Sequence, residues 1–376
     1  MASGAQAQRV VVVGGGPAGA AVAITLAHRG LRPIILESRR GPELKVGECL
    51  PPSAGPILKQ LGLNDNLQAE GHLPSYGNRS VWGAAAPVER DFIFGTQGHG
   101  WQLDRLKFEA ALANRAREEG ADWRYGSRLI KCSWRHGCWA LEVQTASENE
   151  TLEADFVVDA TGRPSRLARQ LGAQQIRYDR LIGAALPLQS QKGQEIKECF
   201  TLVEAVDSGW WYSARLPDEK LVLVYVTDSD LLDHKARKTG GLFAMLEETA
   251  HTSRRVSEGG YHPLTEPRIL PANGARLDMV CGERWLAVGD AATAFDPLSS
   301  YGISSALGSG FYAASAIMDF FAGSNSSLLA YSRIIEQAYA QYLLMHYEHY
   351  ALEQRWPEEL FWRRRHEGSG ASSEAG

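Results

Sequence analysis

The sequence has no long block of like charges and no hydrophobic run with the composition of a membrane span. Its 39 Lys and Arg and 44 Asp and Glu residues are spread along the chain and give a formal net charge of −5. Residues 10–27 and 298–318 are uncharged, but glycine interrupts both stretches, and the second is also rich in serine. We therefore expect no nucleic-acid partner, no export signal and no transmembrane segment, and we interpret 298–318 as a buried helix.

Cysteine is scarce and lacks the spacing of a metal site. The five cysteines include no Cys-x-x-Cys pair: Cys49, Cys132, Cys138, Cys199 and Cys281. His346 and His349 suit one face of a helix, but no third ligand accompanies them. The pattern predicts free thiols in a reducing, cytoplasmic environment and no metal site.

A glycine-rich turn separates the first predicted strand, residues 9–13, from the first predicted helix, residues 18–28. A second strand follows and ends at Glu37. Glycines let the backbone approach a pyrophosphate, a helix N-terminus offers unpaired N–H groups, and a carboxylate can accept from ribose hydroxyls. The alternative is a turn selected only for close helix–strand packing. The favoured prediction is a dinucleotide site that comprises Gly14, Gly16, Pro17, Ala18, Gly19 and Glu37.

A second motif favours FAD over NAD as the dinucleotide. Gly289-Asp290 follows a predicted strand, and residues 296–303 lead into a predicted helix that starts at Gly302. An aspartate after a strand can bind the ribityl or bridging part of a dinucleotide. A helix N-terminus near a reduced flavin would stabilise its negative charge. The motif adds four predicted FAD contacts: Asp290, Pro297, Gly302 and Ile303.

These motifs together resemble the flavoprotein monooxygenases of the p-hydroxybenzoate hydroxylase fold. The resemblance covers most of the chain and also includes Arg105-x-x-Phe108-Glu109 and Asp159-Ala-Thr-Gly162. It implies that Arg105, at the start of a long helix over residues 103–119, contacts the FAD. Without the resemblance, Arg105 would be better interpreted as a solvated arginine on a helix surface.

The expected fold class is α/β, with a Rossmann-like FAD-binding lobe of the p-hydroxybenzoate hydroxylase or glutathione reductase type. A substrate lobe built on an antiparallel sheet and a set of C-terminal helices complete it. The expected division is residues 1–75, 100–174 and 266–325 for the FAD-binding lobe, 76–99 and 175–265 for the substrate lobe, 326–367 for the C-terminal helices, and 368–376 for a disordered tail.

Within this superfamily the chain is most similar to the tryptophan-halogenase-like branch and to geranylgeranyl reductases. Residues 47–51, Gly-Glu-Cys-Leu-Pro, resemble the Gly-Glu-x-x-x-Pro strap of the halogenases, and residues 296–302 resemble their loop in front of the isoalloxazine. Halogenases carry a catalytic lysine after the strap, but this chain has no lysine between Lys59 and Lys107. Their Trp-x-Trp-x-Ile-Pro signature is only echoed by residues 210–217. Halogenation is therefore not the expected reaction.

Without that lysine, the remaining chemistry of a reduced flavin with oxygen is hydroxylation, in which the cofactor supplies the electrophile. The form Asp-Pro-Leu-Ser-Ser-x-Gly-Ile is similar to the flavoproteins that mature quinone-cofactor amine and amino-acid oxidases, of the cysteine tryptophylquinone type. Those proteins oxygenate a tryptophan of a precursor protein. The resemblance implies an FAD-dependent monooxygenase acting on an aromatic substrate, with a precursor protein as its partner.

Four side chains are candidates for the chemistry itself. Glu48 would lie near the flavin, where desolvation raises its pKa and suits it to acid–base work, or it would only cap the strap. Ser300 would line the flavin face or satisfy backbone groups. Trp211 and Tyr212 would form an aromatic wall for an indole, although core packing is the expected role for at least one of them.

Several alternatives stay open. They are a small-molecule aromatic hydroxylase or halogenase, an isoprenoid reductase with a long apolar tunnel, and an FAD-binding assembly partner without turnover. No second Gly-x-Gly-x-x-Gly follows a strand. Electrons would therefore come from NAD(P)H that docks transiently or from a separate flavin reductase.

Overall fold

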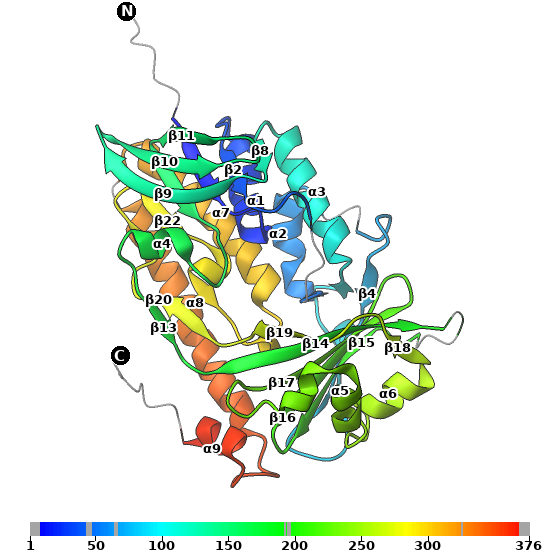
Figure 1. Cartoon of the computed structure of the whole chain (residues 1–376). Coiled ribbons are helices and arrows are strands. Elements are labelled where there is room, and N and C mark those ends of the chain that lie inside the picture. The colour runs from blue at the N-terminus through cyan, green and yellow to red at the C-terminus, as the bar shows by residue number, and fades with distance from the viewer. Residues whose placement is uncertain are drawn as a thin grey trace, which may run out of the picture.

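The computed structural model describes residues 8–42, 47–63, 67–191, 193, 197–324 and 326–367. These residues form two lobes, and the chain returns to the first lobe after building the second (Figure 1). The tail predicted to be disordered, residues 368–376, lies outside the described residues.

The first lobe is built on a six-stranded sheet with the order β21-β22-β12-β1-β2-β8. The five strands from β22 to β8 are parallel, and only β21 is antiparallel. All four valines of β1 are buried because layers cover both faces, which explains the continuous β-branched run. The strands are β1 (Val10–Val13), β2 (Ile34–Glu37), β8 (Asp122–Tyr125), β12 (Phe156–Asp159), β21 (Cys281–Gly282) and β22 (Trp285–Ala287).

Helices α1 (Pro17–His28), α3 (Arg105–Glu118) and α7 (Gly302–Phe321) pack together on this sheet. The uncharged stretch predicted to be a buried helix is α7, and it lies close against α1. A Cβ on Gly310 would come within 2.4 Å of the carbonyl oxygen of Ala18, so only glycine permits this approach. A small antiparallel sheet also belongs to this lobe: β9 (Arg128–Arg135), β10 (Cys138–Gln144) and β11 (Asn149–Ala154).

The second lobe is an eight-stranded sheet, with helices α5 (Thr239–Leu246) and α6 (Thr252–Glu258) beside it (Figure 1). Its pairs are antiparallel except for the parallel pair β15–β5, which joins two distant segments of the chain. The path runs β18 (Tyr261–Pro263), β14 (Leu181–Ser190), β17 (Lys220–Asp228), β16 (Gly209–Leu216), β15 (Phe200–Val206), β5 (Gly77–Val81) and β6 (Val88–Asp91), and β19 (Arg268–Pro271) pairs with β14.

Two three-stranded sheets and several short helices make the connections. One sheet has the order β3-β7-β4 and the other β13-β20-β23. These elements are β3 (Cys49–Leu50), α2 (Gly55–Gln60), β4 (Leu73–Ser75), β7 (Gly100–Gln102), α4 (Arg166–Gln170), β13 (Gln175–Arg177), β20 (Ala275–Leu277) and β23 (Thr293–Ala294).

The C-terminal helices join the two lobes. Helix α8 (Ser327–Ala351) starts beside the first lobe and ends at the second, where α9 (Leu360–His366) follows (Figure 1). Phe361 and Trp362 of α9 are buried in the core of the second lobe, and Arg365 pairs with the buried Asp228 of β17 at 2.8 Å. Among the described residues, no helix is both long and apolar enough to cross a membrane.

Candidate active site

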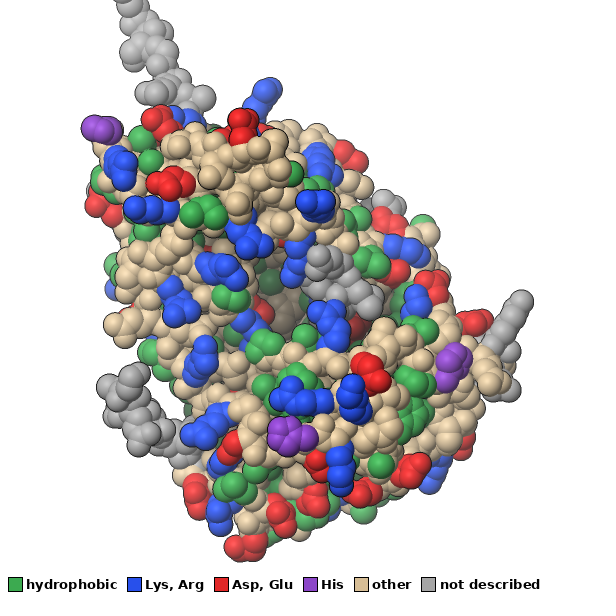
Figure 2. Space-filling model, in the orientation of Figure 1, with side chains coloured by type: hydrophobic (Ala, Val, Ile, Leu, Met, Phe, Trp, Pro, Cys, Tyr) green, Lys and Arg blue, Asp and Glu red, His purple; other side chains and the backbone are tan. Residues whose placement is uncertain are grey.

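A cavity of about 1700 Å³ lies between the two lobes, and Figure 2 shows it as a hollow in the face of the molecule. It is lined by the glycine turn, by the loops after β2, β12 and β22, and by one face of the second lobe's sheet. The predicted cofactor contacts found in its wall are Gly14, Gly16, Pro17, Ala18, Glu37, Arg105, Asp290, Pro297, Gly302 and Ile303.

The glycine turn is tight on its inner side and open toward the cavity. Gly14 has a φ of +112°, and a Cβ there would lie 2.1 Å from the carbonyl oxygen of Ala160. Gly19 lies under the turn rather than in the wall, and a Cβ there would lie 2.0 Å from the carbonyl oxygen of Gly14. A Cβ on Gly16 would meet nothing within 4 Å. Packing thus accounts for Gly14 and Gly19, whereas Gly16 leaves room for a ligand.

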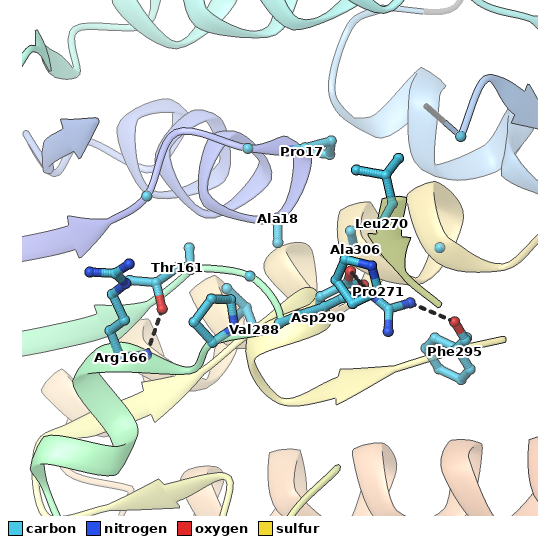
Figure 3. A pocket seen from close by; sticks show the side chains of 18 of the residues that line it. Pro17, Ala18, Thr161, Arg166, Leu270, Pro271, Val288, Asp290, Phe295 and Ala306 are labelled. Carbon is cyan, nitrogen blue, oxygen red and sulfur yellow. Dashed lines mark hydrogen bonds and ion pairs between the residues drawn. The ribbon is translucent and has the colours of Figure 1, made fainter. Parts of the chain in front are cut away.

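Helix α1 presents an uncapped N-terminus at this turn. Its N-cap, Gly16, has no side chain to accept from the first N–H groups, and Pro17 occupies the first position without a donor of its own. Pro17 and Ala18 lie on one side of the cavity and Val288 and Asp290 on the other (Figure 3). Unpaired N–H groups and the positive end of the helix dipole fit a pyrophosphate at this position.

Glu37 lies at the end of β2, and its two oxygens hold the turn in place. Oε2 accepts from the backbone N–H of Gly15 at 2.9 Å, and Oε1 accepts from that of Arg39 at 2.8 Å. Oε1 also accepts from the Ser38 hydroxyl at 3.4 Å, whereas Oε2 keeps a second lone pair, and the side chain lines the cavity. The carboxylate is therefore able to accept from a ribose hydroxyl while it still supports the turn.

Arg105 is not a surface arginine. Asp104 caps α3 by accepting from the N–H groups of Leu106 and Lys107, which fixes the first helical position. The Arg105 side chain is buried, donates to the carbonyl oxygen of Gly47, and forms an ion pair with Glu109 at 2.6 Å. Arg105 also lines the cavity, where its positive charge acts on Glu48 and Asp290.

Asp290 follows β22 and has a partner that sequence reasoning missed. The Nε of Arg163 lies 3.4 Å from its Oδ2. Arg163 also donates to the carbonyl oxygens of Asn273 and Phe295, the latter at 2.8 Å. Burial raises the pKa of Asp290 above its usual range, and the charges of Arg163 and Arg105 oppose that effect. No motif covered Arg163, although it directly follows the quoted Gly162.

The loop that begins at Asp296 is fastened to α8. Leu298 N–H donates to Oδ1 of Asp296 at 2.8 Å, while His346 Nε2 and the Tyr350 hydroxyl contact Oδ2 at 3.0 and 2.7 Å. The N–H of Asp296 donates to the hydroxyl of Tyr342 at 2.9 Å. Burial alone would raise the pKa of Asp296, but the contacts from His346, the Leu298 N–H and the Tyr350 hydroxyl together outweigh it and lower the pKa.

From the sequence, no role was predicted for His346 or for these tyrosines. Their spacing, Tyr342, His346 and Tyr350 at intervals of four, is the signal that would have shown a shared helix face. His346 contacts a carboxylate rather than a metal. Within the described part of the chain, no group of three or more His, Cys, Asp or Glu side chains is arranged to hold a metal ion.

Glu48 lies just behind the cavity wall. Its neighbours Gly47 and Cys49 line the cavity, while Glu48 itself is only 3% exposed. Burial raises the pKa of its carboxyl to about 7 against the charge of Arg105 and the hydrogen bond from the N–H of Gly47. A carboxyl in this state can hold or release a proton near neutral pH.

Ser300 and Cys49 meet at the same wall. Ser300 ends the short turn Pro297–Ser299 with a φ of +53° and lines the cavity. Its side chain hydrogen-bonds the Cys49 thiol, but burial raises the pKa of that thiol to about 12, so it stays protonated. The prediction that Ser300 faces the cavity fits this placement, and the structure adds Cys49 beside it.

The aromatic wall is offset by one residue from the prediction. Trp210 and Tyr212 line the cavity, whereas Trp211 is buried on the other face of the sheet, with its ring 5.0 Å from that of Tyr225. Side chains alternate along a strand, so Trp210 and Tyr212 share a face that Trp211 cannot. Trp210 also donates from Nε1 to the Tyr350 hydroxyl at 3.0 Å. Apolar residues complete this wall: Val224, Val226, Leu270 and Pro271.

The chain matches a known protein family and a relative of similar length. The family model described as FAD binding domain matches residues 7–344. LodB of Marinomonas mediterranea, provisionally named an FAD-dependent oxidoreductase, is 31% identical over 362 residues, which are 95% of this chain and 96% of LodB.

Solved structures show the same fold. The myxobacterial chondrochloren halogenase CndH matches with a TM-score of 0.87 and 22% identity, over 95% of this chain and 86% of its own. QhpG, a peptidyl tryptophan dihydroxylase essential for tryptophylquinone cofactor biogenesis, matches with a TM-score of 0.76 and 24% identity, over 99% of this chain and 81% of its own. The family match and the likeness to CndH confirm the fold class predicted from the sequence.

Proposed function

The chain belongs to the family of flavoproteins that carry the FAD binding domain, and from this premise we propose that it is a monooxygenase that hydroxylates an aromatic ring, a tryptophan of a partner protein. FAD binding and an oxidoreductase activity follow from the family. The reaction and the substrate are the proposed part, and they depend on the residues of the cavity.

We place FAD along the cavity. The uncapped N-terminus of α1 and the Arg105 guanidinium would bind the pyrophosphate, with Glu37 beside the adenosine ribose and Asp290 beside the bridging part. The loop from Pro297 to Ile303 would then lie against the isoalloxazine. When bound and reduced, FAD would supply the two electrons and the site of oxygen activation that a hydroxylation needs.

The apolar and aromatic wall is the observation that carries the proposal. Tyr212 faces the cavity in front of the fully buried Trp210 and beside Val224 and Val226, and among the described lining residues there is no lysine. A wall of this kind can stack on an indole and exclude water from the reacting atoms. The lack of a lysine at this wall favours hydroxylation over the lysine-dependent halogenation of similar flavoproteins.

Glu48 is the proposed acid–base group. It is buried one residue away from the cavity wall, and its pKa of about 7 permits both protonation states near neutral pH. We assign it the role of holding a proton close to the flavin, with Ser300 and Cys49 between it and the open space. Its effect on the reaction would therefore be pH-dependent.

A protein substrate is supported by one structural likeness in particular. QhpG, which shares the fold, modifies a peptidyl tryptophan. The hollow in Figure 2 is open to solvent, so a side chain carried by a larger molecule has a route to the wall. A free aromatic metabolite is the competing substrate and is tested alongside.

We also propose that electrons arrive from outside the chain, through NAD(P)H or a flavin reductase, in a reducing cytoplasm. The five cysteines are all free, which fits that compartment. Mixing the FAD-loaded protein with NADH, with NADPH, or with a reductase plus free flavin, and following the bleaching of flavin absorbance, distinguishes these donors.

Intact mass spectrometry tests the proposal. Purified protein, FAD, a reductant and oxygen are incubated with a quinone-cofactor oxidase precursor or with free tryptophan, in the presence of chloride. The expected result is a gain of oxygen on the precursor, lost when oxygen is omitted. Oxygen gained only by the small molecule would point to a metabolite hydroxylase. Incorporation of chlorine would contradict the argument from the lysine-free wall.

A further inference from the structure

The mouth of the cavity carries a row of arginines that the proposed function leaves unused. Arg128 lies at the start of β9, Arg166 and Arg169 lie in α4, and Arg177 ends β13, and all four are exposed. Figure 2 shows Lys and Arg side chains gathered around the hollow. We name these four residues the arginine rim.

The rim has no counter-charge within the described part of the protein. None of its four arginines forms an ion pair there, and Arg177 donates from Nε only to the neutral Gln175, at 3.1 Å. The acidic side chains that line the cavity are engaged elsewhere: Glu37 with the glycine turn, Asp290 with Arg163, and Asp296 with His346. In a chain of net charge −5, this row is a local excess of positive charge that attracts anions.

The neighbours of the rim suit a polypeptide more than a single phosphate. The rim is interspersed with Gln170, Gln174 and Gln175, which can donate and accept hydrogen bonds, and with Ile130, which is 47% exposed. Protein interfaces are enriched in arginine and depleted of lysine, as this wall is. A phosphate needs donors that converge on one point, whereas these donors are distributed over three elements.

We propose that the arginine rim docks an acidic segment of the partner polypeptide and so holds the partner at the opening of the cavity. The identity of this partner as the substrate rests on the proposed function, but docking itself requires no turnover.

The test measures docking with a defined probe. A fluorescein-labelled decaglutamate peptide is titrated with the FAD-loaded protein and followed by fluorescence anisotropy, at low and at high salt. We expect saturable binding at low salt that weakens as salt screens the charges, and no binding of a neutral Gly-Ser peptide. The double substitution Arg169→Gln with Arg177→Gln should weaken binding roughly threefold to tenfold.

The matched control is Arg254→Gln with Arg333→Gln, because both arginines are exposed, lie on α6 and α8, and do not line the cavity. It should leave binding unchanged. Equal weakening by both double variants would overturn the proposal. Displacement of the peptide by inorganic pyrophosphate at matched charge would also overturn the proposal, because it would indicate a small-anion site. Loss of bound FAD from the rim variant would overturn it as well, because it would assign the arginines to the cofactor.

The two proposals can fail separately. If decaglutamate binds the rim but the precursor gains no oxygen, the docking proposal is supported and the proposed reaction is contradicted. If the precursor is oxygenated but the rim variant binds decaglutamate as tightly as the wild type, the proposed reaction is supported and the docking proposal is contradicted.

Discussion

Gly16 and Gly14 lie two residues apart in one turn and respond to different constraints. A methyl group on Gly16 would enter open cavity space, and the backbone conformation of Gly16 is ordinary for any residue. We therefore predict that Gly16→Ala leaves the unfolding free energy of the FAD-free protein within about 1 kcal/mol of the wild type. Its affinity for FAD should fall at least tenfold, because the methyl group would occupy the space proposed for the pyrophosphate.

Thermal unfolding of the FAD-free protein and a fluorescence titration with FAD measure the two effects. Gly14→Ala is the contrasting variant, because its Cβ would collide with Ala160, and it should fail to fold stably. Normal FAD affinity in Gly16→Ala would contradict the placement of the pyrophosphate at this turn.

Glu48 makes the stability of the protein depend on pH. Burial raises its pKa from 4.5 to about 7, so the folded state binds a proton more tightly than the unfolded state. Its contribution to stability is complete below pH 4.5 and is lost as the pH rises through about 7. Glu48→Gln should remove this dependence, worth about 3 kcal/mol at full ionisation.

The measurement is urea unfolding of both proteins at a series of pH values. The difference between Glu48→Gln and the wild type should grow in favour of the variant between weakly acidic and neutral pH. Glu258→Gln, at an exposed position at the end of α6, should show no such trend. Parallel pH curves for Glu48→Gln and the wild type would rule out the raised pKa.

At the scale of single residues, the sequence was enough to predict those residues whose position is set by neighbouring residues in the chain. The glycine turn and Glu37 are such residues, because strand, turn and helix are consecutive and dictate their geometry. Arg163 was missed because its partners come from distant segments, at Asn273 and Asp290. No local pattern shows that a loop arginine will meet an aspartate more than a hundred residues later.

On the scale of elements, β16 shows the limit of pattern reasoning. The run Trp210-Trp211-Tyr212 falls in the lobe predicted to be built on an antiparallel sheet, and it lies in a strand of that sheet. Both faces of this strand are buried, so hydrophobicity does not distinguish the cavity face from the core face. Trp211 has the core-packing role expected for at least one of the two predicted residues, and Trp210, which was not predicted to line the cavity, takes its place in the wall.

Helix α8 fixes the loop that begins at Asp296 through one of its faces. The Tyr350 hydroxyl donates to Asp296 and accepts from Trp210, so it links the loop to the aromatic wall. Tyr350→Phe would leave a buried carboxylate and a buried indole N–H each short of a partner. We expect a loss of roughly 1–3 kcal/mol in the free energy of unfolding, measured in urea.

The same helix offers a matched control. Tyr347 is 51% exposed, and Tyr347→Phe should change stability by less than about 0.5 kcal/mol. Tyr350→Phe should also shift the visible absorption of bound FAD if the loop position depends on this link. If the two variants were equally stable, the hydroxyl of Tyr350 would make no measurable contribution to holding the loop.

At the scale of the whole molecule, the cavity wall draws on both lobes, so a bound cofactor should stabilise the assembly. A ligand that binds only the folded state adds about 2.7 kcal/mol at a free concentration of about 100 times its Kd. We predict that FAD raises the melting temperature in a concentration-dependent way, and that removing it lowers the midpoint for both lobes together.

Differential scanning calorimetry of the FAD-loaded and FAD-free protein makes the comparison. Tryptophan fluorescence reports on both lobes, through Trp123 and Trp285 in the first and Trp210 and Trp211 in the second, and flavin fluorescence reports on release of the cofactor. Coincident transitions would support a shared unit, whereas a second lobe that melts at the same temperature with and without FAD would contradict it.

The strand order of the first lobe also constrains how the protein is made. Strand β22 comes from residues 285–287, yet it pairs with β12, which pairs with β1 at residues 10–13. A ribosome delivers the chain from the N-terminus, so most of the second lobe leaves the exit tunnel before the first sheet can be completed. The nascent chain must therefore keep an unfinished sheet edge shielded for most of its synthesis, and capture of FAD becomes one of the last events in its biogenesis.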